Sequence, residues 1–206
     1  MQFTLHLDGR TASGGSPLVM HNERLADPLD DFTRALGEVT SRRKKTIADH
    51  EDIGHIEFLG GLYTNPPLSY PLNGKNGQPA LPAWNVLRCL QDGGRRHKRG
   101  MDVPRGIVPL AEYATLEYDG PTDPEKLWQA GGFALRKSVG VQRSRTMRTR
   151  PLFTDWTATL PIEVDMTVFD ENTLELIWRD AGMYAGLGEM RPIYGRFIGT
   201  IAEAKS

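Results

Sequence analysis

The segment that most constrains the fold is the alternating run WTATLPIEVDMTVF at 156–169, because apolar side chains recur there at every second residue. Side chains at that spacing point to one face of a β-strand, so the run predicts a strand with a single buried face. The next segment, DENTLELIWRDAGMY at 170–184, carries apolar residues at helical spacing and predicts an amphipathic helix with an inward face. The alternating set consists of Trp156, Ala158, Leu160, Ile162 and Val164.

The rest of the chain mixes strand and helix patterns without regular alternation. The patterns predict helices that begin at Asp27, near Pro82 and at Asp123. This order predicts an α+β fold with an antiparallel sheet, and a split βαβ arrangement of the ferredoxin-like type suits the C-terminal half best. We expect a single domain over 1–206 with loop insertions at about 8–25 and 63–80. The predicted strands are 3–7, 53–63, 105–120 with a break at Pro109, part of 138–149, and 194–203.

Composition limits the classes of protein to which the chain can belong. The chain has 206 residues, a net charge of -1 and one cysteine, Cys89, which excludes an internal disulfide and a multi-cysteine metal site. No apolar run has the length of a membrane span, and His6 and Asp8 lie where a signal peptide would be apolar. We therefore expect a cytoplasmic protein with no membrane partner.

The basic residues are segregated into three runs. They occupy 42–45, 95–99 and 136–150, hold 14 of the 25 lysines and arginines, and contain no acidic residue. A nearly neutral chain with such segregation can present one positive face to an anionic partner.

The run QRSRTMRTRP at 142–151 is the densest of these. On a regular strand Arg143 and Arg145 point to one face, and Arg148 and Arg150 to the other. An exposed edge strand kept soluble by charge would explain the pattern. We favour a binding role, because closely spaced arginines repel one another unless anions lie near, and the planar guanidinium suits phosphate.

The second candidate is GGRRHKRG at 93–100, which follows a predicted helix. A solvated helix end, favoured by the helix dipole, would explain its charge. A flexible phosphate-binding segment is the alternative. The residues concerned are Arg95, Arg96, Lys98 and Arg99.

The third candidate is the stretch AGLGEMRPIYGRFIG at 185–199, between the last predicted helix and the last strand. Its glycines suit a tight helix-to-strand connection with close packing. They also suit a loop whose backbone N–H groups and arginines contact phosphates. The residues concerned are Gly186, Gly188, Arg191, Gly195 and Arg196.

Catalytic patterns are sparse. His50 and His55 lie among acidic residues in ADHEDIGHIE, but their spacing matches no metal motif, and a charged start of a strand explains them. We read Cys89 as a packed core thiol. We therefore expect no catalytic residue, no cofactor and no metal, and a binding protein rather than an enzyme. If the chain has an activity, a metal-independent ribonuclease is the one that its scattered histidines and tyrosines would suit.

The chain resembles the RAMP superfamily, the RNA-binding proteins of CRISPR effector complexes. The resemblance lies in Gly186-Leu187-Gly188 followed by Gly195, placed between the last helix and last strand, and in LPAWNVLRCLQDGGRR, where a proline-led turn opens a basic helix. It implies ferredoxin-like folds and RNA binding through a glycine-rich loop.

The chain is also similar to a group of phage-encoded proteins. MRTRPLFTDW and GLGEMRPIYGRF match their shared pattern, and this similarity covers roughly 80–200. It implies no established activity, and it places the protein in the host cytoplasm if a phage encodes it.

Together these features predict a domain that binds single-stranded nucleic acid, RNA rather than DNA, through the basic segments and the glycine-rich loop. The alternative is an interaction or assembly protein that engages a host protein complex or self-associates. The two alternatives differ in whether the basic segments meet phosphates or an acidic protein surface.

Overall fold

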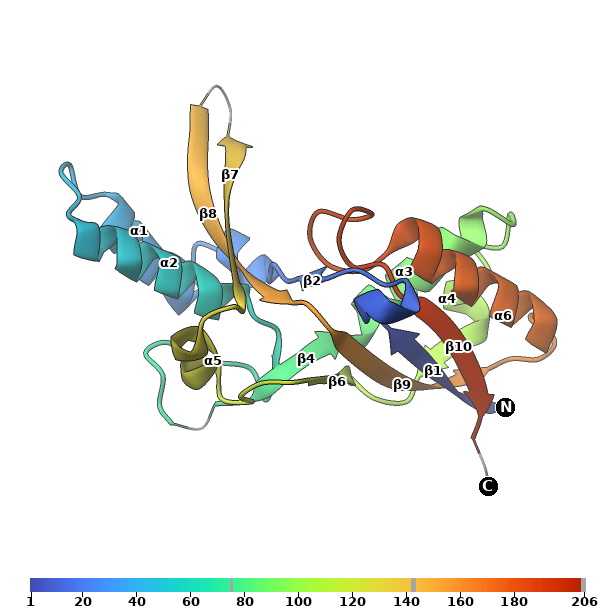
Figure 1. Cartoon of the computed structure of the whole chain (residues 1–206). Coiled ribbons are helices and arrows are strands. Elements are labelled where there is room, and N and C mark those ends of the chain that lie inside the picture. The colour runs from blue at the N-terminus through green and yellow to red at the C-terminus, as the bar shows by residue number, and fades with distance from the viewer. Residues whose placement is uncertain (75, 142–143, 205–206) are drawn as a thin grey trace. The chain divides into compact units, whose positions relative to one another are not determined.

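The computed structural model of the protein describes residues 1–74, 76–141 and 144–204 (Figure 1). The fold is α+β with antiparallel sheets, which confirms the expected class. The chain divides into two compact units. Unit 1 comprises Met1–Leu18, Ala80–Asp119 and Phe153–Ser206, and unit 2 comprises Val19–Pro79 and Gly120–Leu152.

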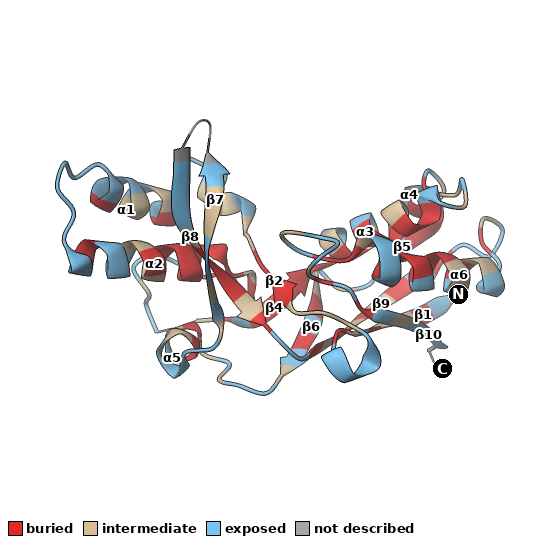
Figure 2. Ribbon diagram, turned by 45° about the horizontal axis from the view of Figure 1, so that its top comes forward, coloured by how far each residue is buried: buried red, intermediate tan, exposed pale blue. Residues whose placement is uncertain are grey.

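Unit 1 is built on an antiparallel sheet with the strand order β10, β1, β9, β6, β4. The alternating segment forms β9, and its five apolar residues are all buried, as Figure 2 shows in red. Helices α3 and α6 pack against each other, α3 also contacts β6, and α6 also contacts β10. The strands are β1 (Gln2–Asp8), β4 (Gln78–Pro82), β5 (Ile107–Pro109, on β9), β6 (Tyr113–Tyr118), β9 (Trp156–Val164) and β10 (Ile198–Glu203).

The helices of unit 1 connect these strands. Helix α6 begins after Asp170, whose side chain accepts a hydrogen bond from the Thr173 N–H group and caps the helix. A single π-helical turn, η3, then leads into the glycine-rich loop. The elements are η1 (Thr11–Ser13), α3 (Ala83–Arg95), α4 (Val103–Gly106), α6 (Glu171–Asp180) and η3 (Ala181–Ala185).

Unit 2 combines helices with a β-hairpin. Strands β7 and β8 pair antiparallel, and β2 pairs with β8 on its other side. The ring of Phe58 in α2 lies 5.3 Å from that of Trp128 in α5, so aromatic packing joins these two helices. The elements are β2 (Leu18–Val19), η2 (Glu23–Ala26), α1 (Asp31–Thr40), α2 (Ile47–Gly61), β3 (Thr64–Asn65), α5 (Pro124–Ala130), β7 (Ala134–Val141) and β8 (Ser144–Phe153).

The predicted strand over 53–63 is wrong, because these residues form most of helix α2. Thr46 caps this helix: its hydroxyl accepts a hydrogen bond from the Asp49 N–H group, and the Asp49 carboxylate accepts one from the Thr46 N–H group. The segment is apolar because the C-terminal half of the helix is buried on every side. A short apolar run of this kind does not distinguish a buried helix from a strand.

The predicted start of helix α1 is also wrong. Asp27 lies before the helix, and Asp30 is the residue that caps it by accepting a hydrogen bond from the Phe32 N–H group. The basic run 42–45 lies after the helix, in the connection to α2.

Candidate nucleic-acid interface

The arginine-rich segment forms one strand of the hairpin in unit 2. Its register places Arg145 opposite Gly140 and Arg148 opposite Lys137. Like charges directly opposite each other in an antiparallel pair are destabilising, so the pair formed by Arg148 and Lys137 needs an anion nearby. Arg143 lies outside the described residues.

Helix α2 supplies that anion through Glu57. This carboxylate is only 1% exposed, and it accepts hydrogen bonds from the Arg148 guanidinium and, at 2.8 Å, from the Thr149 N–H group. Gly54 lets the strand approach, since a Cβ atom there would lie 3.2 Å from the Thr149 hydroxyl oxygen. Arg148 therefore fastens the hairpin to the helix, and its charge is neutralised.

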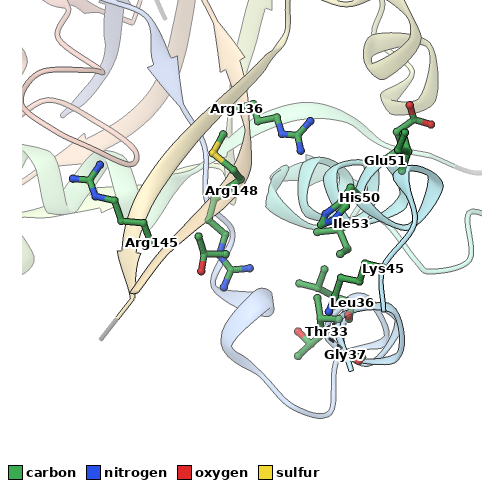
Figure 3. A pocket seen from close by; sticks show the side chains of 14 residues that line it. Thr33, Leu36, Gly37, Lys45, His50, Glu51, Ile53, Arg136, Arg145 and Arg148 are labelled. Atoms are coloured by element: carbon green, nitrogen blue, oxygen red, sulfur yellow. Dashed lines mark hydrogen bonds between the residues drawn. The ribbon is translucent and has the colours of Figure 1, made fainter. Parts of the chain in front are cut away.

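Above this attachment, α1, α2 and the hairpin enclose a groove of about 920 Å³, which we call the hairpin groove (Figure 3). Arg136 extends from β7 toward α2, where His50 lies, whereas Arg145 stands at the rim and points away from the helices. The charged or titratable residues that line the groove are Lys45, His50, Glu51, Arg136, Arg145 and Arg148. Its large apolar lining residues are Leu36, Ile47, Ile53 and Met147.

Three of the groove's cations have no carboxylate partner among the described residues. Arg136 and Arg145 are exposed and form no ion pair or hydrogen bond there. Lys45 donates a hydrogen bond to the Arg42 carbonyl oxygen at 3.0 Å and forms no ion pair with any described acidic residue. The groove thus holds positive charge that no described residue neutralises.

Arg150 lies in the same strand but outside the groove. Its side chain is buried, with 8% exposed, and donates a hydrogen bond to the Thr149 carbonyl oxygen at 3.4 Å. A bound strand cannot reach this guanidinium while unit 2 keeps this packing.

The basic end of α3, in unit 1, is arranged differently, because most of its charges are paired. Arg95 contacts Asp92 at 2.6 Å, and Arg99 contacts Asp102 at 2.9 Å and the Val168 carbonyl oxygen. Lys98 is exposed and has no ion pair within the described ranges.

Asp180 of α6 pairs with two further basic residues at this end of α3, His97 and Arg96. It accepts a hydrogen bond from His97 at 2.8 Å and lies 3.4 Å from Arg96, whose guanidinium covers the Tyr184 ring at 3.9 Å. Burial alone would raise the pKa of Asp180, but the hydrogen bond and charge of His97, the charge of Arg179 and the hydrogen bond from Arg96 outweigh it and lower the pKa. The contact between Arg96 and Tyr184 brings the end of α3 next to the start of the glycine-rich loop.

The glycines of that loop serve contacts within the chain. Gly186, Gly188 and Gly195 have φ values of 70°, 75° and 75°, which side chains disfavour. A Cβ atom at Gly195 would overlap the carbonyl group of Leu187. What approaches Gly186 and Gly195 is therefore the loop's own backbone.

Several backbone donors of the loop are also used internally. The N–H groups of Gly186, Leu187 and Gly195 donate to the carbonyl oxygens of Ala181, Gly195 and Pro17, at 2.8 to 2.9 Å. The Arg196 N–H group donates to the Ser16 hydroxyl at 2.9 Å. A phosphate at this loop would be held by the exposed side chains of Arg191 and Arg196.

Sequence reasoning did not identify the groove or the roles of Lys45, His50 and Arg136 in it. The basic runs contained Lys45 and Arg136. Helix α2, which also lines the groove, was not predicted, because residues 53–63 were predicted to form a strand. Of the predicted contacts, Arg145 and Arg148 line the groove in unit 2, and those at α3 and in the glycine-rich loop belong to unit 1.

The sequence matches no protein-family model, and comparison with curated proteins finds no significant match. Within the described ranges, no cluster of three histidine, cysteine or acidic side chains is suited to hold a metal ion. No helix in the part of the chain that the structure describes combines the length and apolar character needed to cross a membrane.

Proposed function

We propose that the protein binds single-stranded nucleic acid, RNA in preference to DNA, with the hairpin groove as its main contact. The observation that carries this proposal is a set of three cations around one groove, Lys45, Arg136 and Arg145, for which the described residues supply no carboxylate partner. Phosphates neutralise such charges and release counterions, which favours binding. The preference for RNA rests on the resemblance to the RAMP superfamily.

We further propose that unit 1 is a ferredoxin-like domain into which unit 2 is inserted. Support comes from the chain order β1, α3, β6, β9, α6, β10 and the sheet order β10, β1, β9, β6. That is the order of a split βαβ sheet, in which each half supplies one central strand and one outer strand. Lys98, Arg191 and Arg196 on unit 1 would add phosphate contacts.

Salt dependence tests the proposal. We expect the affinity for a labelled oligoribonucleotide to fall steeply between about 50 and 200 mM salt, with a logarithmic slope of about 0.7 for each phosphate neutralised. Arg136→Ala and Arg145→Ala should each lower that slope by about 0.7, the amount expected for the loss of one phosphate contact. Lys126→Ala is the matched control, because Lys126 is an exposed cation of unit 2 outside the groove. Affinity independent of salt, or an equal loss in the control, would contradict the proposal.

A second candidate is an interaction or assembly protein that engages a host protein complex or a second copy. The observation that favours it is an apolar hollow on unit 1 beside the exposed Trp84 and Leu110, which Leu87 and Tyr113 also line. Exposed apolar surface of this kind suits a protein contact. Light scattering tests for self-association. Self-association that Trp84→Ala abolishes supports assembly, and a protein that stays monomeric at all concentrations argues against it.

A further inference from the structure

We propose that the hairpin groove takes up an unstacked base of the bound strand, so that unit 2 grips nucleotides and not the sugar-phosphate chain alone. This inference rests on the proposed function and concerns the same groove. It identifies the ligand as a strand with unpaired bases.

The apolar lining is the first reason. Ile47 and Met147 are large apolar side chains that are 81% and 47% exposed, yet both lie in the groove. A surface made only to hold phosphates has no use for them, because phosphates are strongly hydrated. The face of a base is flat and apolar, and it gains from contact with such side chains.

The volume of the groove is the second reason. At about 920 Å³ it falls within the range of pockets that enclose small organic ligands. Duplex bases are paired and stacked, so a duplex cannot place the face of a base in such a groove. A single strand can turn a base into it at low cost.

The distribution of charge is the third reason. Lys45 and Arg136 lie on opposite walls, on the α2 side and on the hairpin, with Arg145 at the rim. Phosphates on either side of an inserted base can reach these positions, and the planar Arg136 guanidinium can also stack on the base. Among the described residues, Glu51 is the one carboxylate in the lining.

Glu51 also distinguishes between ligands. A carboxylate repels a phosphate but accepts a hydrogen bond from the exocyclic amine of adenine, cytosine or guanine. Its place in the groove therefore favours a base over a phosphate in that part of the site. The ligand that suits all these groups is an amine-bearing nucleotide in a single strand.

The test compares two probes on the full-length protein. One is an oligoadenylate of about ten residues, and the other is an oligomer of the same length and charge without bases. We expect the wild-type protein to bind the abasic probe about tenfold more weakly. Equal affinities would overturn the base pocket and leave the proposed nucleic-acid binding intact. Binding of neither probe would overturn both.

Variants locate the effect in the groove. The double substitution Ile47→Ser with Met147→Ser should weaken oligoadenylate binding about tenfold and leave abasic binding unchanged, whereas Arg145→Ala should weaken both. Leu29→Ser is the matched control, since Leu29 is 72% exposed in unit 2 and does not line the groove. An equal loss for both probes in the double variant would overturn the inference, and thermal melts confirm that each variant folds.

Discussion

The guanidinium of Arg148 donates a hydrogen bond to the buried carboxylate of Glu57, 91 residues earlier in the chain. The pair joins strand β8 to helix α2 and neutralises an arginine that the hairpin register sets opposite Lys137. Arg148 was predicted as a nucleic-acid contact, and the structure gives it a role in holding the groove together. A substitution at Arg148 therefore changes stability as well as charge.

The first prediction concerns this pair. Glu57→Ala and Arg148→Ala should each lower the free energy of unfolding by about 2 to 3 kcal/mol, because each leaves its partner without a charged counterpart. The double variant should lose less than the sum of the two, since both changes remove the same interaction. Urea denaturation measures all three. Arg145→Ala is the control, and we expect it to keep the wild-type midpoint; additive losses would contradict the prediction.

The second prediction concerns the glycine-rich loop. Gly195→Ala should lower the free energy of unfolding by more than about 2 kcal/mol, since Gly195 has a positive φ and an added Cβ would overlap the Leu187 carbonyl group. A thermal melt measures the change.

Gly37→Ala provides a control of opposite sign. Gly37 is exposed in helix α1, and a Cβ there meets nothing within 4 Å. We expect it to raise stability by about 0.5 to 1 kcal/mol. Equal effects of the two substitutions would show that the loop tolerates a side chain at 195.

The third prediction concerns the single cysteine. Cys89 is fully buried in α3, and burial raises the pKa of its thiol. Since the thiolate is the reactive form, Cys89 should not react with a disulfide reagent at pH 8 in the folded protein and should react at once in denaturant. Reaction of the native protein within the mixing time would contradict the prediction and show that local unfolding of α3 exposes Cys89.

Strands and helices with one buried face could be predicted from the sequence. Strand β9 and helix α6 followed the expected patterns, because alternation and helical spacing report directly which face is buried. Helix α2 was missed because its second half is buried on all sides and loses that periodicity. The capping pair of Thr46 and Asp49 was the signal that could have identified it.

The candidate site was harder to predict, because its properties depend on distant pairs. The run 95–99 contains no acid, yet Asp180 folds back onto His97 and Arg96 and neutralises much of its charge. Within the hairpin, Arg145 and Arg148 look equivalent in sequence, but Glu57 pairs only with the second. Charge density in the sequence therefore overstates the charge available to a ligand.

The last prediction concerns Asp180 and pH. Its pKa is lower in the folded protein than in the unfolded chain, where it is about 3.9, so the folded state favours the carboxylate. This stabilisation is complete above the unfolded pKa and is lost as the pH falls through the folded pKa. Asp180→Asn should therefore melt below the wild type at pH 7, and the difference should shrink below about pH 4. Melting temperatures from pH 7 to pH 2.5 measure it, with Glu175→Gln, an exposed carboxylate on the same helix, as the control for net charge. A difference that stays constant across this range would mean that Asp180 acts through packing and not through its charge.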